Sequence, residues 1–572
     1  MDGKPYRQSY IFGILVTCTC IILAQSSSVG AAKIVRAEVK VISPASGATV
    51  AGSVSIAATA TSTVSWVDFY IDSKWIASSP PYTDSWNSTT VANGSHVISV
   101  KGFSGRGTLM TTAAIDVNVE NVTATPTPTP TATPTPTPSP TPSATPSPTP
   151  TPAPNGTAYY IDSSQAGYNG ASSPSAGSVC ALADAGPGTS SGAPKCTLAS
   201  VAAMQASLTS DTQVLFKRGD LWAEELSITT LQGTAGHPII LGAYGSGAPP
   251  IIDGGSTRHT CINAEGTTAK YITIDGFECR NTTEYGITFQ TSGGAMPGIT
   301  VQNTSIHNTG PGAYAGGSGA FDDGNYRNQL DFEDYGSGTG ADGVNFLNNT
   351  VMNCGGHNCV EVHYDAGGPT VQGNLVGPGC VHNCIDLKGT VGATIDHNIA
   401  TTGAKTGAQG CIYLENTYTA NSSVLMTRNV CYGSAVAFQV DTGGTCSGHT
   451  HCFQAITGYN NTMVAPANAA YPIIVGGSGA PDDITMTWEN NITDGGTVDI
   501  NSAVKWTGDY NDDGGHQGQY ATNVTLGSHD LIDVDPLYVN FTGDDFHLQA
   551  GSPVANAGLP GLDNDMTSMG AY

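Results

Sequence analysis

The chain has 572 residues, of which 39% are hydrophobic and only 11% are charged, and it contains 72 glycines. This composition excludes an intrinsically disordered chain, which would be rich in charge and poor in apolar residues. The formal net charge of −26 excludes the basic surface that nucleic acids and anionic membranes require, so we expect no nucleic-acid partner.

Residues 1–32 are predicted to be a secretory signal peptide. Lys4 and Arg7 precede an apolar run from Ile11 to Ala24, and small residues follow that run. A basic start, a short apolar core and small residues near a cleavage point are typical of such signals, and the run is too short to favour a membrane anchor. No other stretch is apolar enough to span a membrane, so we expect a secreted protein.

Residues 38–121 alternate apolar and polar side chains in short runs that turn residues separate. This period of two predicts a seven-strand β-sandwich. The segment resembles bacterial immunoglobulin-like domains through its runs at 66–72, 81–86 and 94–98, and the resemblance implies a spacer or a carbohydrate-binding module. Residues 122–156 form a Thr/Ser-Pro tract, which cannot pack a core and is predicted to be an extended linker.

In the region from 157 to 572, a short motif of Asn followed by small or apolar residues recurs. Its Asn residues are Asn303, Asn349, Asn374, Asn398, Asn429, Asn461 and Asn491. Successive copies lie 24–32 residues apart, except for a gap of 46 after Asn303. This period is that of one coil of a parallel β-helix with Asn stacking at a turn. The long gap predicts an insertion between about Gly310 and Gly340, whose acidic runs leave the helix.

The same region resembles the secreted bacterial right-handed parallel β-helix proteins of the pectate-lyase-like superfamily. The resemblance rests on VLFKRGDLW (214–222) and GTAGHPIILGAYGSGAPPIIDG (233–254) near its start, and on FHLQAGSPVANAG (546–558) near its end. It implies an all-β protein in which the solenoid is joined by the linker to the small β-sandwich, with a helix at 198–208 that caps the first coil. It leaves the reaction open, because this architecture carries many functions.

Aligning the coils predicts one stacked strand whose outward side chains form two columns. The first column is Glu361, Asp386, Tyr413 and Gln439, and the second is His363, Lys388, Glu415 and Asp441. The alternate residues are apolar and should face the core. Titratable groups on a rigid sheet give the support that a catalytic site needs. We therefore expect both columns to form the active site. Tyr413 and Gln439 should contact the substrate, and the residues expected to take part in catalysis are His363, Asp386, Lys388, Glu415 and Asp441.

The run IDLKG (385–389) resembles the coil that bears the catalytic Lys in β-helix pectate lyases and in the chondroitinase-B/alginate-lyase family. The resemblance implies β-elimination on a uronate-containing polysaccharide, with Lys388 as the base and Ca²⁺ held by Glu361, Asp365 and Asp386. The sequence departs from these families at two points. The Asp-Asp-Gly-x-Asp calcium motif is missing near this strand, and Glu415 stands where the chondroitinase family has Arg.

The same columns also fit a glycoside hydrolase that uses Asp386, Glu415 and Asp441. Neighbours in one column, such as Glu415 and Asp441, should lie about 5 Å apart, which suits the carboxylate pair of a retaining enzyme. Asp386 and Glu415 should lie roughly 8 Å apart, which suits an inverting enzyme, and the spacing does not choose between the two. A non-catalytic adhesin or carbohydrate-binding protein is the third interpretation. In each case we expect an extracellular polysaccharide as the partner and a monomeric protein.

Fourteen cysteines occur, and Cys18 and Cys20 lie in the predicted signal peptide. The even number that remains predicts disulfides in an exported chain. Cys359, Cys384 and Cys411 should stack within disulfide range on adjacent coils, but the spacing leaves the pairing open. Zinc is the rival interpretation, although no Cys-x-x-Cys pair occurs.

Overall fold

The structure is a computed structural model that describes residues 38–121 and 156–571 with internal gaps, of which the longest are 311–327, 335–341, 402–409, 442–453, 476–483 and 560–567. The predicted signal peptide and nearly all of the predicted linker lie outside the described residues, and so do Cys446 and Cys452. No helix among the described residues is long and apolar enough to cross a membrane.

The N-terminal part is a β-sandwich of a three-stranded sheet, in the order β1-β3-β6, and a five-stranded sheet, in the order β2-β8-β7-β4-β5. Its strands are β1 (Val39–Ser43), β2 (Thr49–Val50), β3 (Ser53–Ala60), β4 (Trp66–Ile71), β5 (Lys74–Ser79), β6 (Thr83–Asn87), β7 (Gly94–Phe103) and β8 (Leu109–Val119). The predicted sandwich is confirmed, with one short strand more than expected, β2. Trp86 is buried in its core, so its ring is not free to stack on a sugar.

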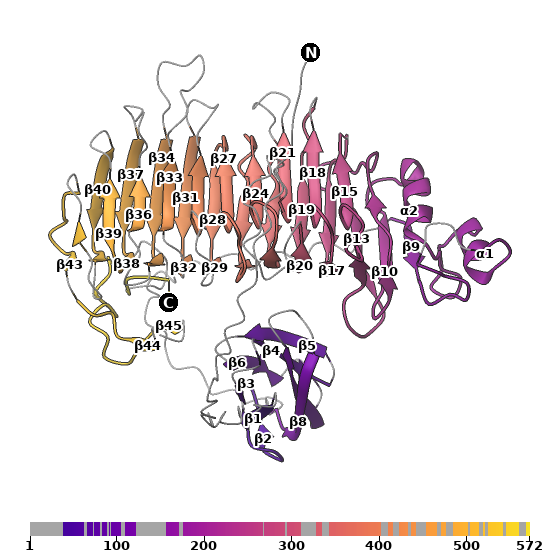
Figure 1. The fold of residues 1–572 in the computed structure, drawn as a ribbon, viewed down its shortest axis with the longest axis horizontal. Helices are drawn as coiled ribbons and strands as arrows, with labels where there is room; N and C mark the ends of the chain where they lie inside the picture. Colours follow the sequence, from indigo (N-terminus) through magenta and orange to yellow (C-terminus); the bar gives the residue numbers. More distant parts are fainter. Residues whose placement is uncertain are drawn as a thin grey trace, which may run out of the picture.

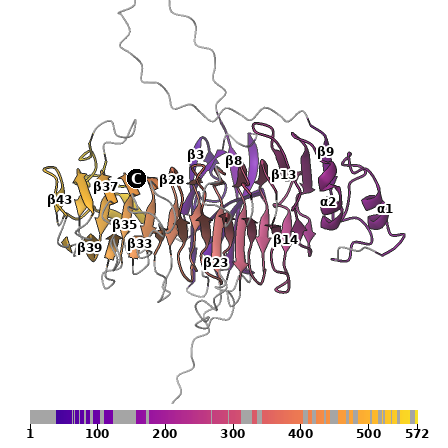
Figure 2. The same ribbon diagram turned by 90° about the horizontal axis from the view of Figure 1, so that it is seen from above.

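The rest of the chain is a parallel β-helix built from three sheets, and each coil adds one strand to each sheet (Figure 1). Seen from above, the coils follow one another along a single axis from β9 to β43 (Figure 2). Every sequential pairing in these sheets is parallel, from β9–β10 to β41–β43. The predicted β-helix is confirmed.

We name the three sheets in the order in which the chain enters them. Sheet 1 contains β9 (Ala158–Ile161), β10 (Gln213–Lys217), β13 (Ile239–Tyr244), β16 (Ile272–Asp275), β19 (Ile299–Gln302), β22 (Asn345–Leu347), β25 (Thr370–Gln372), β28 (Ala393–Asp396), β31 (Ser422–Thr427), β34 (Gln454–Tyr459), β37 (Ile484–Glu489) and β40 (Lys505–Asp509). Sheet 2 contains β11 (Leu221–Trp222), β14 (Ile251–Asp253), β17 (Glu278–Arg280), β20 (Ser305–Thr309), β23 (Thr350–Cys354), β26 (Leu375–Val376), β29 (Ile399–Thr401), β32 (Val430–Tyr432), β35 (Thr462–Val464), β38 (Ile492–Asp494), β41 (Asp512–Asp513) and β43 (Leu531–Ile532). Sheet 3 contains β12 (Leu226–Ser227), β15 (Ile262–Glu265), β18 (Ile287–Thr291), β21 (Leu330–Asp334), β24 (Val360–His363), β27 (Ile385–Lys388), β30 (Ile412–Glu415), β33 (Val436–Asp441), β36 (Tyr471–Val475), β39 (Thr497–Ile500) and β42 (Gln519–Tyr520).

An Asn ladder runs through the turn between sheets 1 and 2. Its members are buried, and each side-chain oxygen accepts a hydrogen bond from the backbone N–H of the preceding member: Asn349, Asn374, Asn398, Asn429, Asn461, Asn491 and Asn511. At this turn the backbone N–H groups do not pair within the sheets, and the ladder side chains satisfy them. The prediction was wrong by one residue in the first copy. Thr304 holds the ladder position there, and Asn303 lies exposed beside it.

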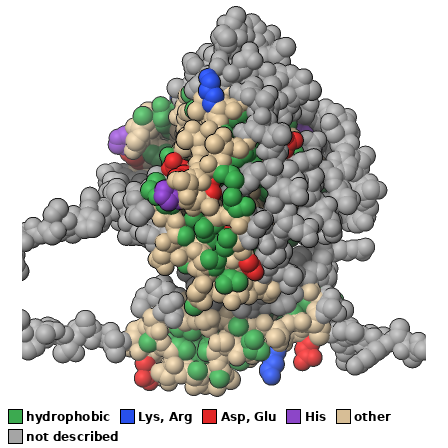
Figure 3. Space-filling view, turned by 90° about the vertical axis from the view of Figure 1, so that its left-hand side faces the viewer, with side chains coloured by type: hydrophobic (Ala, Val, Ile, Leu, Met, Phe, Trp, Pro, Cys, Tyr) green, Lys and Arg blue, Asp and Glu red, His purple; other side chains and the backbone are tan. Residues whose placement is uncertain are grey.

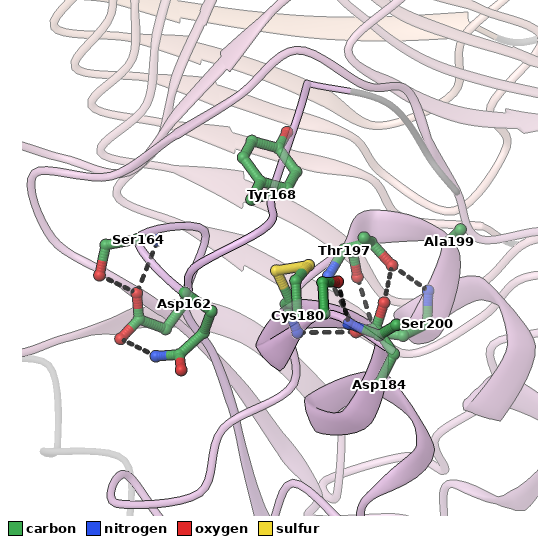
Figure 4. The surroundings of a disulfide bond; sticks show 12 residues. Asp162, Ser164, Tyr168, Cys180, Asp184, Thr197, Ala199 and Ser200 are labelled. Carbon is green, nitrogen blue, oxygen red and sulfur yellow. Dashed lines mark hydrogen bonds between the residues drawn. A yellow bond between two sulfur atoms is a disulfide. The ribbon is translucent and has the colours of Figure 1, made fainter. Parts of the chain in front are cut away.

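The first coil is closed by two short helices, α1 (Val179–Ala185) and α2 (Leu198–Met204), and α2 is the predicted capping helix, followed by a 3-10 turn at Gln205–Ser207. A disulfide between Cys180 and Cys196 ties α1 to the start of α2 (Figure 4). Asp184 accepts hydrogen bonds from the backbone N–H and the hydroxyl of Thr197, at distances of 3.0 and 2.7 Å. The cap therefore covers the open end of the core with satisfied polar groups.

Four more disulfides lie at the corner between sheets 2 and 3. They join Cys261 to Cys279, Cys354 to Cys359, Cys380 to Cys384, and Cys411 to Cys431. The predicted disulfides are confirmed, and the zinc interpretation is wrong for these cysteines. Cys359, Cys384 and Cys411 do stack, but each pairs across the corner and not along the stack, so these bonds fix the point where the chain enters each sheet 3 strand.

At the other end, residues of β44 (Tyr538–Asn540) and β45 (Asp545–Leu548) pack over sheet 2 and bury a second apolar cluster. Seen from this end, Lys and Arg are sparse among the described side chains (Figure 3). Asp512 of β41 is fully buried here, and neither of its carboxyl oxygens has a hydrogen-bond partner among the described residues. Burial, together with the charges of Asp494 and Asp535, raises the pKa of Asp512 to about 8.

This buried carboxyl predicts a pH dependence of stability. The folded state keeps the Asp512 proton up to about pH 8, whereas the unfolded chain loses it near pH 4. The contribution of Asp512 to the free energy of unfolding is therefore fully present only below pH 4. Between pH 4 and pH 8 this contribution falls by about 1.4 kcal/mol per pH unit. In thermal unfolding, Asp512→Asn should be more stable relative to the wild type at pH 9 than at pH 5. An equal difference at both pH values would contradict the prediction.

Candidate functional site

The candidate site is the outer face of sheet 3, where the two predicted columns occur in the predicted register. The first column continues as Thr288, Asp331, Glu361, Asp386, Tyr413 and Gln439, and the second as Gln290, Glu333, His363, Lys388, Glu415 and Asp441. The apolar residues between the columns are buried in the core. Val360 and Val362, for example, flank Glu361, so the period of two turns the polar side chains of β24 outward.

Sequence reasoning missed Asp331 and Glu333. It assigned these residues to an insertion that leaves the helix, but β21 lies in register between β18 and β24. The insertion does exist, and it lies on either side of β21. Thr300 of β19 and Asn345 of β22 are register partners on adjacent coils of sheet 1, yet they lie 45 residues apart in the chain, more than in other coils. The alternation Leu330, Asp331, Phe332, Glu333 repeats that of β24, and this was the signal that could have placed it.

A second Asn ladder sets the carboxylates of the first column. The side-chain oxygen of Asn328 accepts the backbone N–H of Asn358, and that of Asn358 accepts the N–H of Asn383. Each Asn also donates its amide group to the carboxylate three residues later, namely Asn328 to Asp331, Asn358 to Glu361 and Asn383 to Asp386. The repeated Asn-x-x-Asp/Glu spacing in three successive coils is therefore a structural signal that the sequence already contained.

His363 lies at the centre of the acidic residues. Its Nδ1 atom is 3.2 Å from Glu333 Oε1 and 3.1 Å from Glu361 Oε1, and its Nε2 atom is 3.4 Å from Asp386 Oδ1. Burial alone would lower the pKa of His363. The charge of Glu361 and the hydrogen bonds to Asp386 and Glu333 outweigh it, and they raise the pKa well above its usual value.

The carboxyl groups around His363 differ in their protonation. Burial raises the pKa of Glu361 well above its usual value, and the charges of Glu333 and Asp331 add to this shift. Burial and Glu333 also raise the pKa of Asp331 to about 7. Burial acts in the same direction on Asp386, but its hydrogen bond to His363 and the charge of His363 prevail, and the pKa is lowered. Carboxyl groups with raised pKa values thus lie beside a carboxyl group with a lowered pKa in one cluster, which is typical of catalytic and cation-binding sites.

Lys388 and Glu415 form an ion pair at the more exposed edge of the patch. Their side chains are 21% and 25% exposed, whereas Glu361 and Asp386 have almost no exposed surface. Burial would lower the pKa of Lys388, but the hydrogen bond and the charge of Glu415 raise it. Lys388 is also the one Lys or Arg among the described strands of sheet 3.

The three residues expected to hold Ca²⁺ do not turn their carboxylates to a common point. Asp365 accepts hydrogen bonds from the backbone N–H groups of Gly343, Val344 and Gly367, at 2.9, 2.8 and 2.6 Å. Its carboxylate therefore holds a turn together. Asp386 accepts two amide hydrogen bonds from Asn residues and faces His363 with its other oxygen. These three residues therefore do not form a Ca²⁺ site, and Ca²⁺ binding by the protein stays a prediction.

The remaining predicted residues extend the columns toward later coils. Tyr413 is buried under the exposed edge, and Gln439 is half-buried in the next coil. Asp441 is the backbone register partner of Glu415, and its side chain lies outside the described residues. The acidic run Phe321–Gly324 of the insertion also lies outside them.

Comparisons with known proteins agree with the two-part architecture. The bacterial Ig domain family matches residues 38–100. No curated protein matches the chain. The predicted combination of a bacterial Ig domain and a parallel β-helix is confirmed by this match and by the sheets described above.

Three solved structures represent the structural similarities. A GH136 lacto-N-biosidase from Eubacterium ramulus is 14% identical, and the match covers 66% of this chain and 67% of that chain with a TM-score of 0.45. An alginate lyase from Paenibacillus sp. str. FPU-7 is 18% identical, with coverage of 54% and 95% and a TM-score of 0.36. Fibronectin(III)-like modules of Clostridium thermocellum CbhA are 28% identical, with coverage of 15% and 100% and a TM-score of 0.14.

Proposed function

We propose that the β-helix cleaves an extracellular polysaccharide by glycoside hydrolysis, with Glu415 as the nucleophile. The observation that carries this proposal is the Lys388–Glu415 ion pair at the exposed edge of a polar face, with Asp441 next in register. Five disulfides and the predicted signal peptide support action outside the cell. A solenoid face is long and rigid, which suits an extended polymer.

Glu415 and Asp441 occupy neighbouring strands of one column. Adjacent strands lie about 4.8 Å apart, and the carboxyl groups of retaining glycosidases lie about 5–5.5 Å apart. In this proposal Glu415 attacks the anomeric carbon while Asp441 protonates the leaving oxygen. Asp441 then takes a proton from the water that releases the sugar from Glu415. Lys388 contacts Glu415 and orients it.

Asp386 is a weaker candidate for the second carboxyl group. It is 2% exposed, and its oxygens are already engaged by Asn358, Asn383 and His363. We therefore assign Asp386 to positioning His363. Gln439 is half-buried and follows Tyr413 in the register of the first column, and it is the residue of that column that we propose to contact the substrate.

The lyase interpretation requires Lys388 to remove a proton from the substrate. A base must be neutral to do so, but the ion pair with Glu415 raises the pKa of Lys388 and keeps it protonated. The lyase proposal therefore needs this pair to break when substrate binds. The ion pair favours hydrolysis over β-elimination.

A comparison of Lys388→Ala with Glu415→Ala tests the proposal on a panel of neutral and uronate-containing polysaccharides. Hydrolysis should release new reducing ends without ultraviolet absorbance. It should be lost in Glu415→Ala and only reduced, by about 10- to 100-fold, in Lys388→Ala, because Lys388 orients the nucleophile and does not react. Unsaturated, ultraviolet-absorbing products that vanish in Lys388→Ala would show a lyase instead. Binding without any cleavage by the wild type would show a carbohydrate-binding protein.

A further inference from the structure

Two buried glutamates and a histidine meet at one point of sheet 3, two coils before Glu415. Glu333 of β21, Glu361 of β24 and His363 of β24 each offer one ligand atom, and these atoms lie within 4.8 Å of one another. We propose that they bind a divalent transition-metal ion. This inference stands without the hydrolysis proposal, because none of the three residues is assigned a step in it.

The distances between these atoms are those of ligands around one ion. A metal held at about 2.1 Å by each ligand, with angles of about 90–109° between them, separates neighbouring ligand atoms by about 3.0–3.4 Å. His363 Nδ1 is 3.2 Å from Glu333 Oε1 and 3.1 Å from Glu361 Oε1. A small outward movement of the three side chains would make room for the ion without changing the strands.

The surroundings orient the ligands from behind. The Nε2 atom of His363 faces Asp386, which leaves Nδ1 toward the two glutamates. A metal-bound histidine usually has such a carboxylate on its other nitrogen, because it fixes the tautomer and the ring orientation. The second oxygen of Glu361, Oε2, accepts a hydrogen bond of 2.5 Å from Asn358, so this carboxylate is also held from outside the cluster.

Burial gives an independent reason for an ion. Glu361 is fully buried, and within the described part of the chain its Oε1 atom has His363 Nδ1 at 3.1 Å but no well-directed hydrogen bond. A buried carboxylate oxygen whose contacts are poorly directed is costly. A cation between Glu333, Glu361 and His363 would satisfy that oxygen and offset the repulsion of the two glutamates.

The ligand set indicates the class of metal. Ca²⁺ and Mg²⁺ prefer oxygen ligands alone, whereas an imidazole nitrogen beside carboxylates suits Zn²⁺, Mn²⁺ and related first-row ions. No cysteine thiolate is available in the described part of the cluster, which disfavours the softer ions. We therefore expect Zn²⁺ or Mn²⁺ to bind and Ca²⁺ to bind more weakly by at least 10-fold.

The test is metal binding by the full secreted chain after treatment with a chelator and dialysis. Titration with Zn²⁺, Mn²⁺ or Ca²⁺, followed by calorimetry and by elemental analysis, should give one equivalent of Zn²⁺ or Mn²⁺ and a rise in Tm. His363→Ala and Glu361→Gln should each weaken binding by 100-fold or more. Asp386→Asn, which acts through His363, should weaken it by about 10- to 100-fold.

His307→Ala is the matched control, because His307 also faces a glutamate, Glu278, but on sheet 2. It should leave the affinity within twofold of the wild type. Circular dichroism and the melting curve of each metal-free variant show whether it is folded, and Glu361→Gln keeps the shape of the side chain if His363→Ala does not fold. Absence of bound Zn²⁺ and Mn²⁺, equal binding by folded Glu361→Gln, or tighter binding of Ca²⁺ would overturn the proposal.

Discussion

Glu415→Gln is expected to lower kcat by 10³-fold or more on the polysaccharide that the wild type cleaves. The amide keeps the size of the side chain but cannot form the glycosyl ester that a retaining mechanism requires. A loss of this size corresponds to about 4 kcal/mol of transition-state stabilisation. The measurement is the initial rate of reducing-end release at saturating substrate.

The control for this variant is Glu489→Gln. Glu489 is a half-buried glutamate at the end of β37, so the same substitution is made on sheet 1 and away from the proposed site. Its kcat should stay within twofold of the wild type. A Glu415→Gln variant that retains a tenth or more of the wild-type kcat would remove Glu415 from the role of nucleophile.

Asn398→Ala should destabilise the solenoid by about 3–5 kcal/mol, or prevent it from folding. Asn398 is fully buried, and its side chain makes four hydrogen bonds to described residues. Its amide donates to Val371 O at 2.8 Å and to Asn429 Oδ1 at 3.0 Å. Its oxygen accepts from the backbone and side-chain nitrogens of Asn374 at 3.0 and 2.9 Å. Alanine leaves several buried polar groups without partners, and each costs about 1–3 kcal/mol.

Asn303→Ala is the matched comparison. Asn303 belongs to a sequence motif of the same appearance, but its side chain is exposed and donates a hydrogen bond of 2.8 Å to Asp275. We expect a change below about 0.5 kcal/mol, as for other exposed positions. Denaturant unfolding followed by circular dichroism compares the two variants, and similar midpoints for both would contradict the importance assigned to the ladder.

The register of the site could be predicted because two periods in the sequence agree. Alternation within each strand distinguishes Glu361 from Val360, and the coil length places Glu361 beside Asp386. Where the coil length changed, the prediction failed. β21 was missed because long segments precede and follow it, so the spacing no longer identified Asp331 and Glu333 as members of the columns.

Other features depend on tertiary contacts that the periodicity of the sequence does not encode. Asp365 binds backbone N–H groups of a turn, and this depends on the shape of that turn rather than on residue type. Each stacked cysteine pairs with a cysteine across the corner between sheets 2 and 3, at Cα–Cα distances that lie between 5.3 and 5.9 Å for the four disulfides there. The spacing between cysteines along the stack also falls within disulfide range, so the sequence alone did not identify the partner. The Lys388–Glu415 ion pair follows from the register, but its effect on the pKa of Lys388 required the burial of both side chains.

The most direct measurement of the central claim is the stereochemistry of cleavage, followed by ¹H NMR at early times on a polysaccharide that the panel identifies. The proposed Glu415–Asp441 pair on adjacent strands of sheet 3 predicts a product whose anomeric configuration is that of the bond cleaved. A product of inverted configuration would exclude the Glu415–Asp441 pair, and an unsaturated sugar at the new chain end would contradict hydrolysis itself.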